Sequence, residues 1–287
     1  MVASVIADIG RDSTRERGRS LTVTSPDDWL GALPSERGRP TVSLVAPIGP
    51  PSGSGANAAK GLADDGNVYW FKLPDNEQGV RVLANEVIVG ALGSRLGAPV
   101  RQCVLASVAP GLLLRPDGSR GPARGPSSVA HASLHLESAL EDDDLTYTRR
   151  DDNSRRQVWI MALWDLCLGQ DPQWLYDSSE DYTIWSYDHG LWFWSGEGDW
   201  DPAMLRRSVL EDSTYAPRPH GLDRSTVAEV AEALADLTRN DLLKVVSAVP
   251  IEWGIPDVDL EHLAWFLYER REMVADRLVR TLSATRA

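Results

Sequence analysis

The feature of this sequence that most constrains its fold is a lysine inside an apolar, aromatic run. Residues Val68–Leu73 read Val-Tyr-Trp-Phe-Lys-Leu and stop at Pro74, a pattern typical of a buried β-strand followed by a turn. Burying the Lys72 ammonium in such a strand is costly unless an anion meets it. The next run, 81–89, has a helical pattern and carries Glu86. We therefore expect a strand and a helix that pack so that Lys72 meets Glu86, an anionic ligand, or both.

Composition restricts the class of protein. The 287 residues are 43% hydrophobic, enough for one large domain or a two-lobed unit. A net charge of −13 argues against a nucleic-acid binder and against docking on anionic lipid. Cys103 and Cys167 are far apart in sequence, so they predict neither a zinc site nor a disulfide framework. We expect no membrane partner and a cytoplasmic protein, because no apolar run is long enough to span a bilayer and residues 1–8 lack a secretory signal pattern.

The first half of the chain has a β-rich pattern. Residues 1–40 are weakly patterned, although Ser25 is a good helix N-cap, and we expect a weakly ordered extension there. Residues 41–110 predict a small antiparallel sheet with one helix, 80–96, that ends at Gly97. The segment 47–60, which joins two predicted strands, is rich in glycine and proline. Such a segment either forms a plain surface loop or lets the backbone approach phosphate closely.

The second half has a helical pattern. We interpret residues 111–154, with their acidic run 141–144, as a connection, and 155–287 as a mainly helical unit. Within it we predict a strand 182–187 whose hairpin continues through 191–194. Seven of the eleven tryptophans fall between Trp159 and Trp200, which favours an aromatic core over an aromatic-walled cleft. The predicted helices are 155–168, 225–238, 239–248 and 259–282.

Two carboxylates of the helical half follow buried elements. Asp171 comes just after the buried helix, and Pro172 disfavours helix at that position, so Asp171 belongs to a loop. Asp188 stands at the end of the strand 182–187. With Lys72 and Glu86 they form the set that phosphoryl transfer needs: a cation for the phosphates, a metal ligand and a carboxylate near the acceptor hydroxyl. Each residue also has an ordinary structural interpretation, as does Asp165 inside the buried helix.

These motifs resemble the HipA-like kinases, in particular the short bacterial group that keeps the kinase core alone. The most specific segments are the lysine strand with its continuation, 69–79, the Asp-His-Gly turn in 186–193, and the Pro-x-x-Trp segment 250–253. The segments 85–89, 96–100 and 267–271 also match, and the resemblance covers residues 41–282. It implies an α+β, bilobal, protein-kinase-like fold, related to that of phosphatidylinositol kinases. The N-lobe would be a small antiparallel β-sheet with one helix and the C-lobe mainly α-helical, with ATP and Mg²⁺ between them.

The resemblance also implies a role for each site residue. Lys72, paired with Glu86, would hold the ATP phosphates. Asp171 would act on the acceptor hydroxyl, and Asp188 would bind Mg²⁺. The glycine-rich segment would cover the phosphates with Gly53, Ser54, Gly55 and Asn57.

One position departs from the family pattern. The family has an asparagine five residues after the catalytic aspartate as a second metal ligand, and here that position is Tyr176. Either Gln173 or Asp177 substitutes, or the metal site is impaired. We therefore predict an ATP- and Mg²⁺-dependent phosphotransferase acting on a hydroxyl of a protein or small molecule. The alternatives are an inactive pseudokinase or nucleotide-binding module, and an interaction protein with an aromatic surface of Trp185, Trp192 and Trp194.

Overall fold

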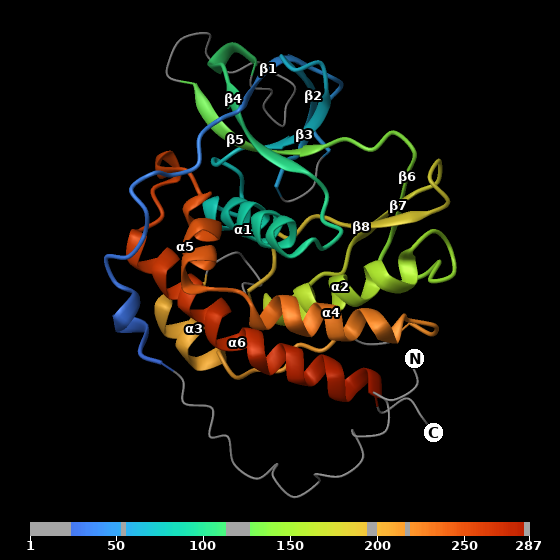
Figure 1. Ribbon diagram of the computed structural model, residues 1–287. Coiled ribbons are helices and arrows are strands. Elements are labelled where there is room, and N and C mark those ends of the chain that lie inside the picture. Colours follow the sequence, from blue (N-terminus) through green and yellow to red (C-terminus); the bar gives the residue numbers. More distant parts are fainter. Residues whose placement is uncertain (1–23, 53–55, 113–126, 194–199, 216–218, 284–287) are drawn as a thin grey trace, which may run out of the picture.

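The computed structural model describes residues 24–52, 56–112, 127–193, 200–215 and 219–283. Figure 1 shows a β-barrel at one end of the molecule, helices filling the other end, and helix α1 between them. A second, three-stranded sheet lies beside helix α2 (Asn153–Leu166). The mixed α and β content agrees with the sequence-based expectation. Among the described helices, none combines the length and apolarity needed to cross a bilayer.

The barrel consists of five strands in the order β1-β2-β3-β5-β4. It closes because β1 and β4 pair in parallel, whereas the sequence pattern predicted an antiparallel sheet only. Ala130 and Ala132 of β5 are fully buried inside it beside Tyr69 and Phe71 of β3. The strands are β1 (Val42–Pro47), β2 (Ala59–Ala63), β3 (Val68–Lys72), β4 (Cys103–Val108) and β5 (Ser128–Leu134).

Strand β5 belongs to the barrel although it lies outside residues 41–110, where the sequence predicted the sheet. It lies within residues 111–154, which the sequence indicated as a connection, yet it pairs with both β3 and β4. Small residues occupy alternate positions along β5, and small side chains fit the interior of a narrow barrel. The β-branched and aromatic residues that usually indicate a strand are therefore few.

Helix α1 (Val80–Leu96) has the predicted bounds. It ends at Gly97, whose left-handed conformation lets its N–H reach the carbonyls of Gly93 and Ser94. Most of its residues are buried because the barrel lies on one side and the helical body on the other. This position lets one helix contribute side chains to both halves of the molecule.

The second sheet has the order β6-β7-β8, with β6 (Ala139–Asp142), β7 (Trp174–Asp177) and β8 (Thr183–Ser186). The predicted hairpin of 182–187 with 191–194 is therefore wrong, because β8 pairs with β7. The chain after β8 turns instead of extending: Asp188 has a φ of 53°, and Asn85 of α1 donates hydrogen bonds to the carbonyls of Gly190 and Trp192.

The helical body is organised around α6 (Asp257–Ser283), which packs against all the other helices of this half. These are α2, α3 (Pro202–Ser208), which the sequence analysis missed, α4 (Arg224–Ala235) and α5 (Arg239–Ser247). Short 3-10 helices occur at Pro26–Trp29, Pro110–Leu112 and Ile251–Trp253.

The tryptophan-rich stretch forms core. Trp174, Trp192 and Trp200 are at most 1% exposed, and Trp164 contacts Trp174 and Trp192 through tilted and edge-on ring pairs. Because Trp192 is buried, it cannot belong to the predicted aromatic surface of Trp185, Trp192 and Trp194. Trp194 lies outside the described residues.

The described part of the N-terminal extension packs more closely than its sequence indicated. Ser25 caps the 3-10 helix Pro26–Trp29, as expected. Trp29 is 3% exposed, with its ring 5.4 Å from that of Tyr268 and 4.9 Å from the Arg239 guanidinium. One buried aromatic residue thus anchors a segment whose polar sequence gives little sign of order.

Candidate active site

Lys72 is the last residue of β3, and it is 9% exposed. Its Nζ lies 2.5 Å from Glu86 Oε1 and 2.6 Å from Asp188 Oδ1. The strand, α1 and the turn after β8 therefore meet at one ammonium. The sequence analysis named all three residues, and the structure brings them together.

Glu86 connects this ion pair to the turn after β8. Its second oxygen, Oε2, accepts a hydrogen bond of 2.9 Å from the backbone N–H of His189. The His189 ring is fixed in turn by a 2.8 Å hydrogen bond between Nε2 and Ser186 Oγ. A Cβ on Gly190 would lie 3.3 Å from Val82 Cβ, so the turn packs tightly against α1. The turn that carries Asp188 is thus held in place by its contacts with Glu86 and Val82 of α1.

The three charges shift one another's pKa values. Burial alone would lower the pKa of Lys72, but the carboxylates of Glu86 and Asp188 outweigh it and raise that pKa above its ordinary value. Burial raises the pKa of Glu86, yet the Lys72 ammonium wins and holds it well below its usual range. Burial and the charge of Glu86 raise the pKa of Asp188 despite Lys72. One ammonium between two carboxylates leaves one negative charge uncompensated.

That excess charge fits a cation site. The Asp188 side chain is 36% exposed, whereas the Glu86 side chain is 4% exposed, so Asp188 is the carboxylate that a further ligand can reach. Carboxylate oxygens are ligands that Mg²⁺ prefers. The donor chemistry therefore suits a divalent cation at Asp188.

Asp171 lies at the same end of the β7–β8 pair as Asp188. Trp174 pairs with Ser186, so the loop that enters β7 and the turn that leaves β8 are adjacent. Asp171 is exposed, with a φ of 53°, and its Oδ2 accepts a 2.7 Å hydrogen bond from Gln173 Nε2. Within the described part of the chain, no hydrogen bond or ion pair joins Asp171 or Gln173 to the three residues of the ion pair.

The segment predicted to cover phosphates is only partly described. Gly53, Ser54 and Gly55 lie outside the described residues. Asn57 has a left-handed φ of 48°, which turns the chain into β2. Since Ala59 pairs with Phe71, the same antiparallel register extended by one residue places Ala58 opposite Lys72. The loop between β1 and β2 therefore returns next to the lysine.

Tyr176, which occupies the position of the family's asparagine, is a core residue. It is fully buried; its hydroxyl accepts a 2.8 Å hydrogen bond from the N–H of Thr146 and donates to the carbonyl of Asp144 at 3.1 Å. Burial raises its pKa to about 12. A neutral phenol used in this way cannot serve as a metal ligand.

Asp177 is ruled out as a substitute ligand. It pairs with Thr183, at the opposite end of the sheet from Asp188, and its Oδ1 accepts 2.6 Å hydrogen bonds from Ser138 and Ser179. Of the two substitutes that the sequence suggested, only Gln173 lies at the correct end.

His131 belongs to this region but was missed by the sequence analysis. It pairs with Lys72 across β3 and β5 and is 2% exposed. Burial lowers its pKa to about 4 against the attraction of Glu86, and its buried Nδ1 has no hydrogen-bond partner among the described residues. The imidazole is therefore neutral at pH 7. Only correct recognition of β5 as a strand could have placed it beside the lysine.

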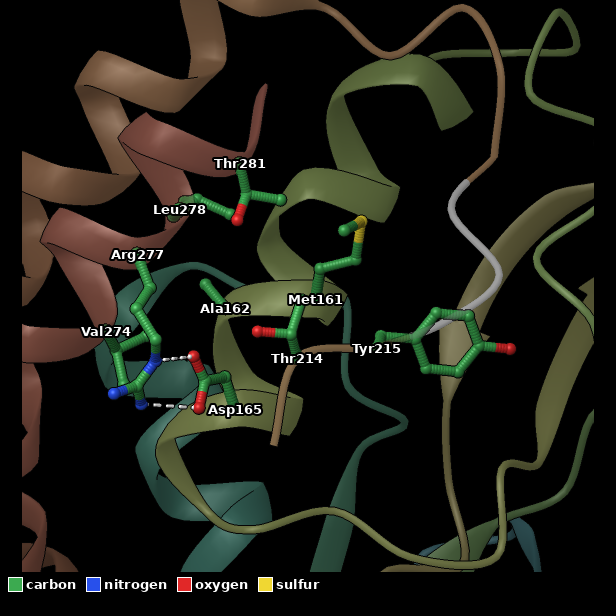
Figure 2. A pocket seen from close by; sticks show the side chains of 9 residues that line it. All are labelled: Met161, Ala162, Asp165, Thr214, Tyr215, Val274, Arg277, Leu278 and Thr281. Carbon is green, nitrogen blue, oxygen red and sulfur yellow. Dashed lines mark hydrogen bonds and ion pairs between the residues drawn. The ribbon is translucent and has the colours of Figure 1, made fainter. Parts of the chain in front are cut away.

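Asp165 has a structural role. Figure 2 shows its carboxylate facing Arg277, with Nε and Nη2 of the guanidinium at 2.8 and 2.7 Å. The cavity beside this pair has a volume of about 10 Å³, too small for more than a single water molecule. Asp165 therefore links α2 to α6 and does not extend the site.

Comparison with known proteins supports the class of fold. No family model and no curated protein matches the sequence. Among solved structures, the chain is similar to the Helicobacter pylori proinflammatory kinase CtkA, at 11% identity over 86% of this chain and 98% of that one, with a TM-score of 0.55. The Golgi casein kinase with Mn/ADP bound is 10% identical over 91% of this chain and 77% of that one, at a TM-score of 0.46.

The chain therefore has a kinase-like fold. This conclusion rests on the structural similarity to CtkA, because the match covers 98% of the CtkA chain. Membership of the HipA-like group is supported by no sequence match and stays a prediction.

Proposed function

We propose that this protein is an ATP- and Mg²⁺-dependent kinase of the HipA-like type, with nucleotide bound between a β-rich lobe and a helical lobe. The acceptor is a hydroxyl of a protein or small molecule. The observation that carries the proposal is the meeting of Lys72, Glu86 and Asp188 from three elements at one buried point. The kinase-like fold supports interpreting this cluster as part of a nucleotide site in preference to an ordinary buried ion pair.

Each residue has a defined part in the proposed reaction. Lys72, oriented by Glu86, binds phosphate oxygens of ATP, and the segment Gly53–Gly55 with Asn57 covers them. Asp171 accepts the proton of the acceptor hydroxyl as its oxygen bonds to the γ-phosphorus. The bond from that phosphorus to the bridging oxygen breaks, and ADP leaves with the electron pair.

Asp188 and Gln173 are the proposed metal-binding residues. Mg²⁺ there would neutralise charge on the phosphates. The proposed metal site has one carboxylate and one carboxamide, and the carboxamide of Gln173 is the same donor group as that of the family's asparagine.

The proposal is tested by following ATP turnover and autophosphorylation of the purified chain with Mg²⁺. Asp171→Asn removes the proton acceptor and should lower the rate by at least about a hundredfold. Asp188→Asn should abolish turnover while leaving the Lys72–Glu86 pair in place, so the protein stays folded.

Asp236→Asn is the matched control, because this exposed carboxylate at the end of α4 accepts no side-chain hydrogen bond within the described structure. Its rate should equal that of the wild type. Turnover in Asp188→Asn equal to the control would reject the proposal.

A second candidate function is nucleotide binding without transfer. It is favoured by Tyr176, whose buried phenol removes one metal ligand of the family pattern. In that case ATP should raise the melting temperature equally with and without Mg²⁺, Lys72→Met should remove the effect, and no phosphate should be transferred.

A further inference from the structure

A cavity of about 240 Å³ lies between α1 and β4, outside the proposed nucleotide site. Helix α1 contributes Val87, Gly90, Ala91 and Ser94 to its wall, and β4 contributes residues 103–105. None of Lys72, Asp171, Gln173 or Asp188 lines it. The cavity is nonetheless adjacent to the site in sequence, because Val87 follows Glu86.

Close backbone contacts fix the boundary of this cavity. A Cβ on Gly90 would lie 2.5 Å from Cys103 Sγ, so α1 and β4 approach closely there. A Cβ on Gly38 would overlap the carbonyl oxygen of Ala248, and the Gly38 N–H donates a 2.9 Å hydrogen bond to the carbonyl of Ser247. The elements around the empty space are therefore in close contact with one another at two points.

The chemistry of the wall selects a type of ligand. Val87, Ala91 and Leu105 make it largely apolar. Burial and the charge of Glu86 raise the pKa of Cys103 to about 12, so its thiol is neutral. Arg39 also lines the cavity; it is exposed, and its guanidinium has no hydrogen bond or ion pair with any described residue.

No carboxylate belongs to the residues that line the cavity, and Arg39 is the one cationic residue among them. An arginine guanidinium pairs with a carboxylate through two parallel hydrogen bonds. At about 30 Å³ for each water-sized group, the volume holds about eight heavy atoms.

We propose that this cavity is a second ligand site, which binds a small aliphatic carboxylic acid. The carboxylate pairs with Arg39 and the hydrocarbon chain lies against Val87, Ala91 and Leu105. The site does not depend on the nucleotide-binding role of Lys72.

The test uses hexanoate as the probe and 1-hexanol as its neutral counterpart. The readout is the rate at which iodoacetamide alkylates Cys103, which lines the cavity; the other cysteine, Cys167, is fully buried. The reaction is run at about pH 9 with excess reagent, because only the small ionised fraction of this thiol reacts. At a hexanoate concentration ten times its dissociation constant, alkylation should slow about tenfold, and the melting temperature should rise by about 2–4 °C.

Two variants test the assignment of the cavity. Arg39→Gln should weaken hexanoate binding at least about tenfold, because it removes the charged partner. Arg207→Gln is its control, since Arg207 is exposed on α3, also lacks a partner among the described residues, and does not line the cavity. Ala91→Phe should abolish protection by filling the space.

The outcomes separate clearly. Protection by hexanoate that is lost in Arg39→Gln and kept in Arg207→Gln supports the site. Failure of hexanoate to slow alkylation in the wild type overturns it. Equal protection by 1-hexanol, or equal protection in Arg39→Gln, overturns the assignment of a carboxylic acid to Arg39.

Discussion

At the scale of single residues, the contribution of the Lys72 ion pair to the free energy of unfolding can be measured. Glu86 is buried, and its carboxylate also accepts the hydrogen bond from the backbone N–H of His189. Asp188 alone would remain to compensate the ammonium after Glu86 is neutralised.

We predict that Glu86→Gln lowers the free energy of unfolding by about 3 kcal/mol, as expected when one partner of a buried ion pair is removed. Urea denaturation measures it. Glu229→Gln serves as control, since its ion pair with Arg155 joins side chains that are 50% and 40% exposed. Its effect should stay within about 0.5 kcal/mol. Similar losses of unfolding free energy in the two variants would show that the buried ion pair stabilises the fold no more than the exposed one.

His131 gives a prediction about pH. Its pKa is lowered from 6.5 to about 4 in the folded protein, so between these values the unfolded chain binds more protons than the native one. Stability contributed by neutral His131 is therefore complete above pH 6.5 and is lost as pH falls toward 4.

We predict that His131→Leu flattens the dependence of unfolding free energy on pH in this window by up to about 1.4 kcal/mol per pH unit. Chemical denaturation at several pH values measures the slope. The exposed His220 is the control: His220→Leu should leave the slope unchanged. An unchanged slope in His131→Leu would mean that this imidazole titrates normally in the native state.

At the scale of elements, the packing of α1 decides the shape of the site. Gly93 of α1 faces Val100, and a Cβ on Gly93 would overlap Val100 Cγ1. Val100 forms an isolated bridge with Ser186, at the end of β8. The helix, the segment after it and the strand that leads to Asp188 are thus in direct contact.

We predict that Gly93→Ala destabilises the protein by about 1–3 kcal/mol, because overpacking outweighs the higher helix propensity of alanine. The double variant Gly93→Ala, Val100→Ala should recover most of this loss, since it removes the methyl groups that clash. Thermal melting of the two variants and of Val100→Ala alone measures the coupling. Additive effects would contradict the contact.

The elements also show what sequence could and could not predict. Residues Val68–Lys72 and Val80–Leu96 have unmistakable patterns and clear stops, and their predicted positions are confirmed. Strand β5 and the pairing of β8 were missed, because small alternating residues give a weak signal and because pairing depends on contacts distant in sequence.

The pairing of Lys72 with Glu86 was expected from the cost of an unpaired buried lysine. Asp188 was expected near them only from its order in the chain and from the resemblance to a kinase family. The position of His131 did not, since it needs the register of a strand that was not recognised. The exclusion of Asp177 likewise needed the β7–β8 register, which reveals at which end of the sheet each aspartate lies.

At the scale of the whole molecule, Arg270 holds the helical body together. It is fully buried on α6 and donates hydrogen bonds to carbonyls of Leu166 at 3.0 Å, Val209 at 3.1 Å and Glu211 at 2.8 Å. It also pairs with Asp165 Oδ1 at 3.1 Å. One side chain thereby joins α6 to the end of α2 and to the segment after α3.

We predict that Arg270→Met costs about 3–5 kcal/mol, because it leaves several buried carbonyls without donors and removes one partner of Asp165. The melting temperature should fall by about 6 °C or more. Arg280→Met, on the exposed surface of the same helix, is the control and should change stability little. Equal melting temperatures for the two variants would contradict this, because the carbonyls that accept from Arg270 would then be hydrogen-bonded to water in Arg270→Met.

The closure of the barrel has a consequence for how this protein meets other chains. Because β1 pairs with β4, each of the five strands has a neighbour on both sides. An open strand is the usual template for edge-to-edge association and fibril growth. Among the described strands of the half that carries Lys72, none is therefore left with a free side for a foreign strand to join.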